Sequence, residues 1–96
     1  MLFAIQCTDR PAALDVRMAA RPAHVAWLEA AAAQLVFVGP VLGPDGNPCG
    51  SILIIEAESL EAARNFAAGD PYAAAGLFES TVVRGFRSVF RDGAKV

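Results

Sequence analysis

The segment Cys49–Glu56 constrains the fold more than any other stretch, because its side chains are apolar on both sides of an extended chain. Its centre, Ile52–Ile55, holds three isoleucines and a leucine, and β-branched residues favour strands. An antiparallel strand with one solvated face alternates apolar and polar residues, which this segment does not. We therefore expect a sheet in which Cys49–Glu56 is a central strand covered on both faces.

Three further segments have the pattern of strands, and two regions have the three- and four-residue spacing of amphipathic helices. The other expected strands are Met1–Thr8, Leu35–Leu42 and Glu79–Phe90. The expected helices lie in Pro11–Gln34 and in the segment that Ser59 caps and Gly69 ends. Pro22 removes a backbone donor inside the first helix, so we expect that helix to kink or to restart there.

The connecting segments are rich in residues that favour turns. Glycine, proline, Asp and Asn dominate positions 43–48, so the second and third strands should pair as a hairpin. Gly39 and Pro40 favour an edge position or a bulge for the second strand. We expect a short helical turn at Pro71–Ala75 and a loose tail at Asp92–Val96.

The resulting order, β-α-β-β-α-β, predicts an α+β, ferredoxin-like fold with a four-stranded antiparallel sheet. A chain of 96 residues suits one such domain, and we assign residues 1–96 to it. Two helices cover only one face of the sheet, while the strands are apolar on both. We expect a second copy to cover the open face, which gives a homodimer with its sheets packed together.

Composition and charge limit the partners. The chain is 55% hydrophobic and has a net charge of −2, and it lacks a basic and aromatic run typical of RNA-binding sheets. We therefore expect a small-molecule ligand or a second copy, and no nucleic acid or membrane. Residues 30–44 form the longest uncharged stretch, and it is too short and too interrupted by glycine and proline to span a bilayer. With no export signal and no CxxC spacing for Cys7 and Cys49, we expect a cytoplasmic protein with reduced, partly buried cysteines.

The segment from Gly69 to Gly76 ends one helix and begins another. Gly69 can adopt the positive φ that ends a helix, and Pro71 suits the first position of a new one. Asp70 between them is placed as an N-cap, with one carboxylate oxygen accepting from the Ala73 N–H. The second oxygen is then free for another partner.

Arg17, Arg21 and His24 are spaced to share one side of the first helix. We expect this side to point away from the apolar stripe of Leu14, Met18, Val25 and Leu28. One interpretation is a solvated basic face with an incidental histidine. In the other, a helix that restarts at Pro22 holds His24 in its first turn, where the helix dipole favours a neutral ring that can act as a base.

Asp70 and His24 lie on helical segments that cover the same face, so a hydrogen bond between them would form a His-Asp pair. Asp70 would fix the imidazole tautomer while His24 moves a proton of a substrate. A pure capping role for Asp70 is an equally strong interpretation. We find no phosphate-binding loop, nucleophile elbow or metal-ligand spacing, and we expect no cofactor and no metal.

Several short motifs occur together in a fixed order along the chain. They are Arg21-Pro22-Ala23-His24, Gly39-Pro40, Gly50-Ser51, Ser-Leu-Glu-Ala-Ala-Arg at 59–64, Asp70-Pro71-Tyr72 and Gly76-Leu77-Phe78. This set resembles the YciI-like (YCII-related) family. The resemblance implies a ferredoxin-like domain of the dimeric α+β barrel superfamily and an active-site pair at His24 and Asp70. Some relatives resemble enzymes that remove chloride from hydroxylated aromatic compounds.

The leading hypothesis is a small enzyme that uses a His24 and Asp70 dyad for metal-free acid–base chemistry. The reaction would be an elimination or isomerisation of a small anionic or phenolic compound. Arg21, Ser51 and Tyr72 would position the substrate, and Arg17 is a further candidate contact for an anion. For Ser51 and Tyr72 a structural role is the simpler interpretation. The alternative function is a non-catalytic dimer that binds a small ligand or assists another enzyme.

Overall fold

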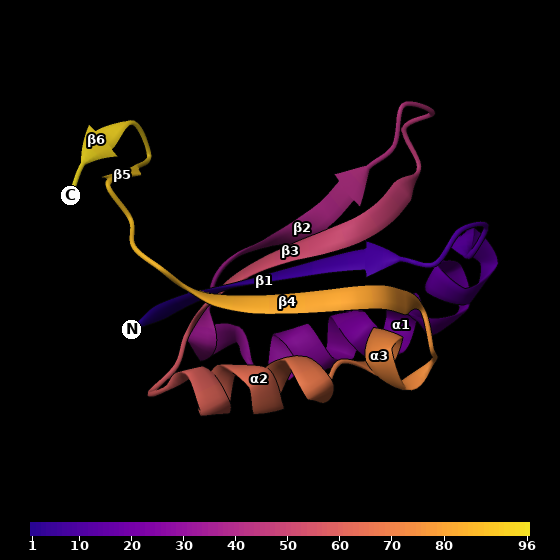
Figure 1. Ribbon diagram of the computed structural model, residues 1–96, viewed down its shortest axis with the longest axis horizontal. Coiled ribbons are helices and arrows are strands. Elements are labelled where there is room, and N and C mark those ends of the chain that lie inside the picture. Colours follow the sequence, from indigo (N-terminus) through magenta and orange to yellow (C-terminus); the bar gives the residue numbers. More distant parts are fainter.

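The computed structural model describes residues 1–96 and contains a four-stranded antiparallel sheet with helices on one face (Figure 1). The strands are β1 (Leu2–Asp9), β2 (Leu35–Leu42), β3 (Pro48–Glu56) and β4 (Phe78–Phe86). The helices are α1 (Leu14–Ala30), the 3-10 turn Ala32–Gln34, α2 (Leu60–Ala68) and α3 (Pro71–Ala74). The strand order is β2-β3-β1-β4. The predicted α+β, ferredoxin-like arrangement is therefore confirmed.

The two central strands carry the core. β1 pairs with β3 so that Phe3 lies opposite Ile55 and Ile5 lies opposite Leu53. All four side chains are buried and point towards the helices, where they meet small alanines of α2. The prediction that Cys49–Glu56 forms a central strand is thus confirmed, and β2 lies at the edge, as expected from Gly39 and Pro40.

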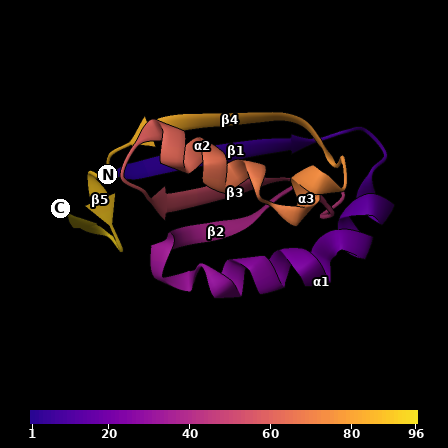
Figure 2. The same ribbon diagram turned by 90° about the horizontal axis from the view of Figure 1, so that it is seen from below.

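The helices cover the sheet unevenly. In Figure 2, α1 runs along the β2 side of the sheet, whereas α2 lies nearer β1 and β4. The short α3 lies between the end of α2 and α1, and it brings Tyr72 into a second buried cluster with Ala13 and Leu77. None of the helices combines the length and apolarity needed to cross a bilayer.

The helix α1 continues through Pro22, so the expected restart of the helix is wrong. A proline in this position removes one backbone hydrogen bond, and the remaining bonds of a 17-residue helix hold the segments on either side together. His24 consequently lies in the interior of α1. The positive end of the helix dipole acts on the first turn only, so it does not reach His24.

The end of the chain also differs from the prediction. The last strand of the sheet stops at Phe86, and a small hairpin follows with strands β5 (Phe90–Arg91) and β6 (Ala94–Lys95). Its turn residues Asp92 and Gly93 have φ values of 52° and 80°. Asp-Gly with two positive φ angles is the preferred two-residue hairpin turn, which explains why the expected loose tail is ordered. The hairpin extends away from the sheet (Figure 1).

The sheet face opposite the helices is uncovered in the single chain (Figure 1). The register places Ile52, Gln6 and Val82 side by side on this face, because Gln6 pairs with both of the others. Phe37, which is 75% exposed, pairs with Ile54 on the same face. An apolar surface therefore follows the sheet from β2 to β4.

Neither cysteine forms a disulfide, and their surroundings differ more than expected. Cys7 is buried in the core and Cys49 is exposed, rather than both being partly buried. Burial raises the pKa of the Cys7 thiol from its ordinary value of 9.0 to about 11, and the hydrogen bond from Thr81 offsets only part of this effect. Cys7 is therefore a protonated core residue at neutral pH.

We predict that Ellman's reagent titrates one thiol, Cys49, in the native protein at pH 8 and both thiols after unfolding in guanidinium chloride. The Cys49→Ser variant should show no rapid reaction, and rapid native labelling of that variant would contradict the burial of Cys7.

The unfolded chain releases the Cys7 proton above pH 9.0 while the native chain keeps it up to about 11. This group therefore lowers the stability as the pH rises through that range.

Candidate active site

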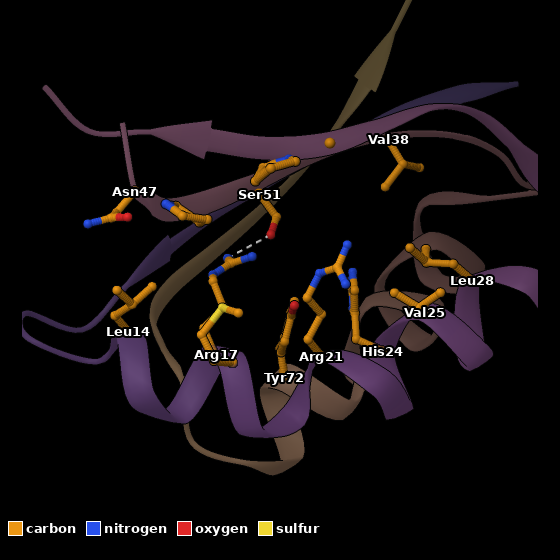
Figure 3. Close-up of a pocket in the computed structure, with 14 residues that line it drawn as sticks. Leu14, Arg17, Arg21, His24, Val25, Leu28, Val38, Asn47, Ser51 and Tyr72 are labelled. Carbon is orange, nitrogen blue, oxygen red and sulfur yellow. Dashed lines mark hydrogen bonds between the residues drawn. The ribbon is translucent and has the colours of Figure 1, made fainter. Parts of the chain in front are cut away.

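A cavity of about 560 Å³ lies between α1 and the β2–β3 side of the sheet (Figure 3). Its apolar lining comes from Leu14, Met18, Val25, Leu28, Val38 and Pro40. Its polar lining comes from Arg17, Arg21, His24, Asn47, Ser51 and Tyr72. The volume lies in the range of small-molecule sites, and a mostly apolar wall with a few convergent polar groups is typical of them.

The basic and apolar residues of α1 share one face, which contradicts the expectation that they point in opposite directions. Leu14, Arg21 and Leu28 are spaced by seven residues, close to two helical turns, so they form one line along α1. Arg17 and His24 are the buried residues of α1, with 4% and 7% of their surfaces exposed. The residue of the expected stripe that is most exposed is Met18, at 54%.

His24 is hydrogen-bonded to Asp70, as the sequence hypothesis required. His24 Nδ1 lies 2.8 Å from Asp70 Oδ1, and Asp70 is only 2% exposed. The same Oδ1 accepts from the Tyr72 backbone N–H at 2.9 Å. Two acceptor contacts fit an ionised carboxylate, so we assign the proton of the imidazole to Nδ1.

The way in which Asp70 caps α3 differs from the prediction. The expected bond from the Ala73 N–H goes instead to the backbone carbonyl of Asp70, and the carboxylate accepts from Tyr72. One oxygen, Asp70 Oδ1, therefore serves both the cap and His24, rather than the two separate oxygens expected from the sequence. Gly69 keeps a φ of −83°, so it does not end α2 in the expected left-handed conformation. Gly69 itself stays in the right-handed helical region, and the chain leaves helical geometry at Asp70, whose ψ is 125°.

The second ring nitrogen of His24 opens into the cavity. Nε2 makes no hydrogen bond within the chain, and no buried side-chain nitrogen or oxygen lacks a partner. Nε2 is therefore accessible, and Figure 3 shows the His24 side chain among those that line the cavity. With Nδ1 carrying the proton, Nε2 holds the lone pair of a base.

Tyr72 packs against the face of the His24 imidazole. Its ring stacks on His24, with centroids 3.9 Å apart and an interplanar angle of 17°. The Arg17 guanidinium carbon lies 4.5 Å from the centre of the same tyrosine ring. Burial raises the pKa of Tyr72, although the positive charges of Arg17 and Arg21 counteract this effect. Tyr72 is therefore a protonated phenol whose ring lies between two functional side chains.

Arg17 is fixed by a buried ion pair. Its Nε and Nη2 donate to the two carboxylate oxygens of Asp9 at 2.8 and 2.9 Å, and Nη2 also donates to Ser51 Oγ at 2.9 Å. Burial alone lowers the pKa of Arg17, but the hydrogen bonds and charge of Asp9 outweigh it and the pKa is raised. The guanidinium therefore stays charged and ties α1 to both central strands.

The five cavity residues predicted from the sequence, His24, Arg21, Ser51, Tyr72 and Arg17, all line the same cavity, and Asp70 lies behind His24. The partner of Arg17, Asp9, was not predicted. The feature of the sequence that could have indicated Asp9 is its place as an acidic residue at the end of the first strand, shortly before the helix that carries Arg17. No group of three or more His, Cys, Asp or Glu side chains gathers in the structure to hold a metal ion.

Gly50 allows Ser51 to reach this position. A Cβ at residue 50 would lie 2.5 Å from the backbone oxygen of Cys7, which is too close for any side chain. The glycine therefore lets β3 approach β1 closely just before Ser51. This explains the Gly50-Ser51 pair at the wall of the cavity.

The YCII-related domain family model matches residues 1–87. Protein YciI of Escherichia coli is 40% identical to this chain, and the match covers 94% of this chain and 100% of the relative. An uncharacterized protein of Haemophilus influenzae is 37% identical over the same shares.

Two solved structures with the same fold differ in how similar they are to this chain. One is 5-chloro-2-hydroxyhydroquinone dehydrochlorinase (TftG) from Burkholderia phenoliruptrix, in complex with 2,5-dihydroxybenzoquinone. Its TM-score is 0.85 at 41% identity, and the match covers 91% of this chain and 94% of that one. An antibiotic biosynthesis monooxygenase matches with a TM-score of 0.54 at 16% identity, which is a likeness of fold alone.

We predict that Asp9→Asn lowers the free energy of unfolding by about 3 to 5 kcal/mol, because it leaves the Arg17 charge buried without its partner. Urea denaturation followed by circular dichroism measures the change. Asp92→Asn is the matched control, since Asp92 is exposed in the hairpin turn and asparagine tolerates its positive φ. A loss of less than 1 kcal/mol in Asp9→Asn would show that this ion pair contributes little.

Proposed function

The chain belongs to the YCII-related family, and on that basis we propose that it is a small-molecule enzyme in which His24 and Asp70 perform acid–base chemistry. The observation that carries this proposal is the 2.8 Å contact between His24 Nδ1 and Asp70 Oδ1 beside the cavity. The reaction class is an elimination, such as dehydrochlorination, or an isomerisation. The substrate class is a small anionic or phenolic compound.

In the proposed step, His24 Nε2 removes a proton from a carbon or oxygen atom of the substrate. In an elimination, the electron pair left behind forms a new double bond as the leaving group departs with its own pair. Proton and leaving group are lost together, so the step needs no oxidant or reductant. Asp70 stabilises the imidazolium that forms, as a buried carboxylate does in other histidine-containing sites. We propose no metal or cofactor for this step.

The surrounding residues support this role for His24. Asp70 fixes the ring through Nδ1, and the Tyr72 stack at 3.9 Å limits rotation of its plane. The apolar part of the lining suits an aromatic ring. Arg21 on α1 and Ser51 on β3 line the cavity and can position its oxygens, and Arg17 donates a hydrogen bond to Ser51. The solved relative that is 41% identical is a dehydrochlorinase of a hydroxylated aromatic compound, which favours this reaction class.

We also propose that the protein is a homodimer whose open sheet faces pack together, and that it acts in the cytoplasm. The support for the dimer is the apolar surface formed by Phe37, Ile52 and Val82, which the helices leave uncovered. An apolar surface that runs across the whole sheet from β2 to β4 is typical of an interface between copies.

We predict that His24→Ala lowers kcat/KM by about 10² to 10⁴-fold, because positioned general acid–base catalysis contributes that much. Chloride release from 5-chloro-2-hydroxyhydroquinone measures the rate. Asp70→Asn should also lower the rate, since it keeps the shape of the side chain and removes its charge. Asn65→Ala, an exposed change on α2, is the control and should retain the wild-type rate.

Circular dichroism of each variant separates a lost fold from a lost base. A folded His24→Ala variant with wild-type turnover would contradict the assignment of the base. A wild-type protein that binds such compounds and converts none of a panel of them would instead favour the non-catalytic binding function.

We predict a mass near twice the 10.0 kDa of the chain in light scattering coupled to size exclusion at micromolar concentration. Val82→Glu should shift the protein towards the monomer, because it places an unpaired charge in the interface. Leu60→Glu is the matched control, since Leu60 is about as exposed as Val82 but lies at the start of α2 on the opposite side. A monomeric wild type would refute the dimer.

A further inference from the structure

Two arginines of α1 line the cavity, but the charge of one is already neutralised. Both oxygens of the Asp9 carboxylate accept hydrogen bonds from Arg17, which keeps only 4% of its surface exposed. Its third bond, to Ser51 Oγ, fixes the guanidinium against β3. The face of Arg17 towards Tyr72 is used as well, at 4.5 Å from the ring centre. A ligand anion would have to compete with Asp9 for this cation.

Arg21 differs from Arg17 in each of these respects. It lies one turn further along α1, its side chain is exposed, and it forms neither a salt bridge nor a hydrogen bond within the chain. The cavity lining includes no aspartate or glutamate that could pair with it. Arg21 is therefore the one cation of the cavity whose charge nothing in the protein compensates.

A ligand that fills the cavity would remove water from the Arg21 guanidinium. Burying a charge without a partner is unfavourable by several kcal/mol, whereas an anionic oxygen would restore a charge-assisted and often bidentate contact. A neutral ligand of the same shape leaves the guanidinium without a counter-charge. The uncompensated charge therefore discriminates between anionic and neutral forms of one ring compound.

We infer that Arg21 determines specificity by binding an anionic oxygen of the ligand, while Arg17 is a positioning residue that holds Ser51 and Tyr72 in place. This inference rests on the proposed function in taking the cavity as the substrate site. Arg21 and His24 are three residues apart on α1, which places their Cβ atoms about 5 to 6 Å apart. Figure 3 shows both side chains at the cavity. An anionic oxygen bound by Arg21 would therefore lie close to the atom that reacts at His24, as it can in a single-ring phenolate or hydroxyquinone.

Isothermal titration calorimetry with two ring compounds tests this inference. The anionic probe is 2,5-dihydroxybenzoquinone, whose hydroxyl groups are conjugated to carbonyls and therefore ionise at neutral pH. The neutral probe is hydroquinone. Arg21→Gln should weaken binding of the anion roughly 10- to 100-fold, as expected for a lost hydrogen bond to a charged group, and change binding of hydroquinone less than twofold. Arg21→Lys should restore part of the affinity for the anion, because it keeps the charge and loses the bidentate geometry.

Arg64→Gln is the matched control, because it removes the same charge from an exposed site on α2, outside the cavity. It should change neither affinity more than twofold. The inference is overturned if Arg21→Gln leaves the affinity for the anion unchanged, if it weakens both probes equally, or if the wild type does not bind the anion.

A second variant distinguishes this inference from the proposed function. His24→Ala removes the proposed base and leaves Arg21 in place, so turnover in His24→Ala tests the proposed function, and anion affinity in Arg21→Gln tests this inference. If the wild type releases no chloride from 5-chloro-2-hydroxyhydroquinone but Arg21→Gln still weakens binding of the anion, the proposed function fails and the role of Arg21 stands. If His24→Ala abolishes turnover but Arg21→Gln leaves the affinity for the anion unchanged, the proposed function stands and the role of Arg21 fails.

Discussion

The arrangement of the cavity depends on one oxygen atom, Asp70 Oδ1. It accepts a hydrogen bond from the Tyr72 N–H at the start of α3. It also contacts Nδ1 of His24, which lies on α1 and is 46 residues away from Asp70 in the sequence. Because α3 begins there, the Tyr72 ring is placed against His24 at 3.9 Å. A single buried carboxylate thus sets the tautomer, the orientation and the packing of the only histidine in the chain.

Two polar side chains of the cavity, Arg17 and His24, are each held by a carboxylate that lies outside the cavity lining. Asp9 neutralises Arg17 from the end of β1, and Asp70 supports His24 from the start of α3. Neither carboxylate lines the cavity itself. As a result, the cavity presents an open imidazole nitrogen, a hydroxyl-bearing wall and one free guanidinium. Under the proposed function, the uncompensated positive charge in this partly apolar cavity is the reason to expect tighter binding of an anionic ring compound than of a neutral one.

The two faces of the sheet have separate roles. The face towards the helices forms the core and carries Ser51 at the cavity, whereas the opposite face is apolar and uncovered in the single chain. Side chains alternate along each strand, so a change on the open face need not disturb the cavity. For the proposed dimer and the proposed ligand site, this separation predicts that assembly and ligand binding can be altered independently, one through Ile52 and Val82 and the other through α1.

The sequence by itself determined the order of strands and helices, because the apolar periods of Cys49–Glu56 and of the helices are local properties. It also singled out His24 and Asp70, together with Arg17, Arg21, Ser51 and Tyr72 among the residues that line the cavity. The tertiary structure alone decided that α1 passes through Pro22, that one oxygen of Asp70 serves two partners, and that Arg17 rather than Arg21 is paired with Asp9. These outcomes depend on contacts between residues on different elements, whose distances are set by packing and cannot be obtained from spacing along the chain.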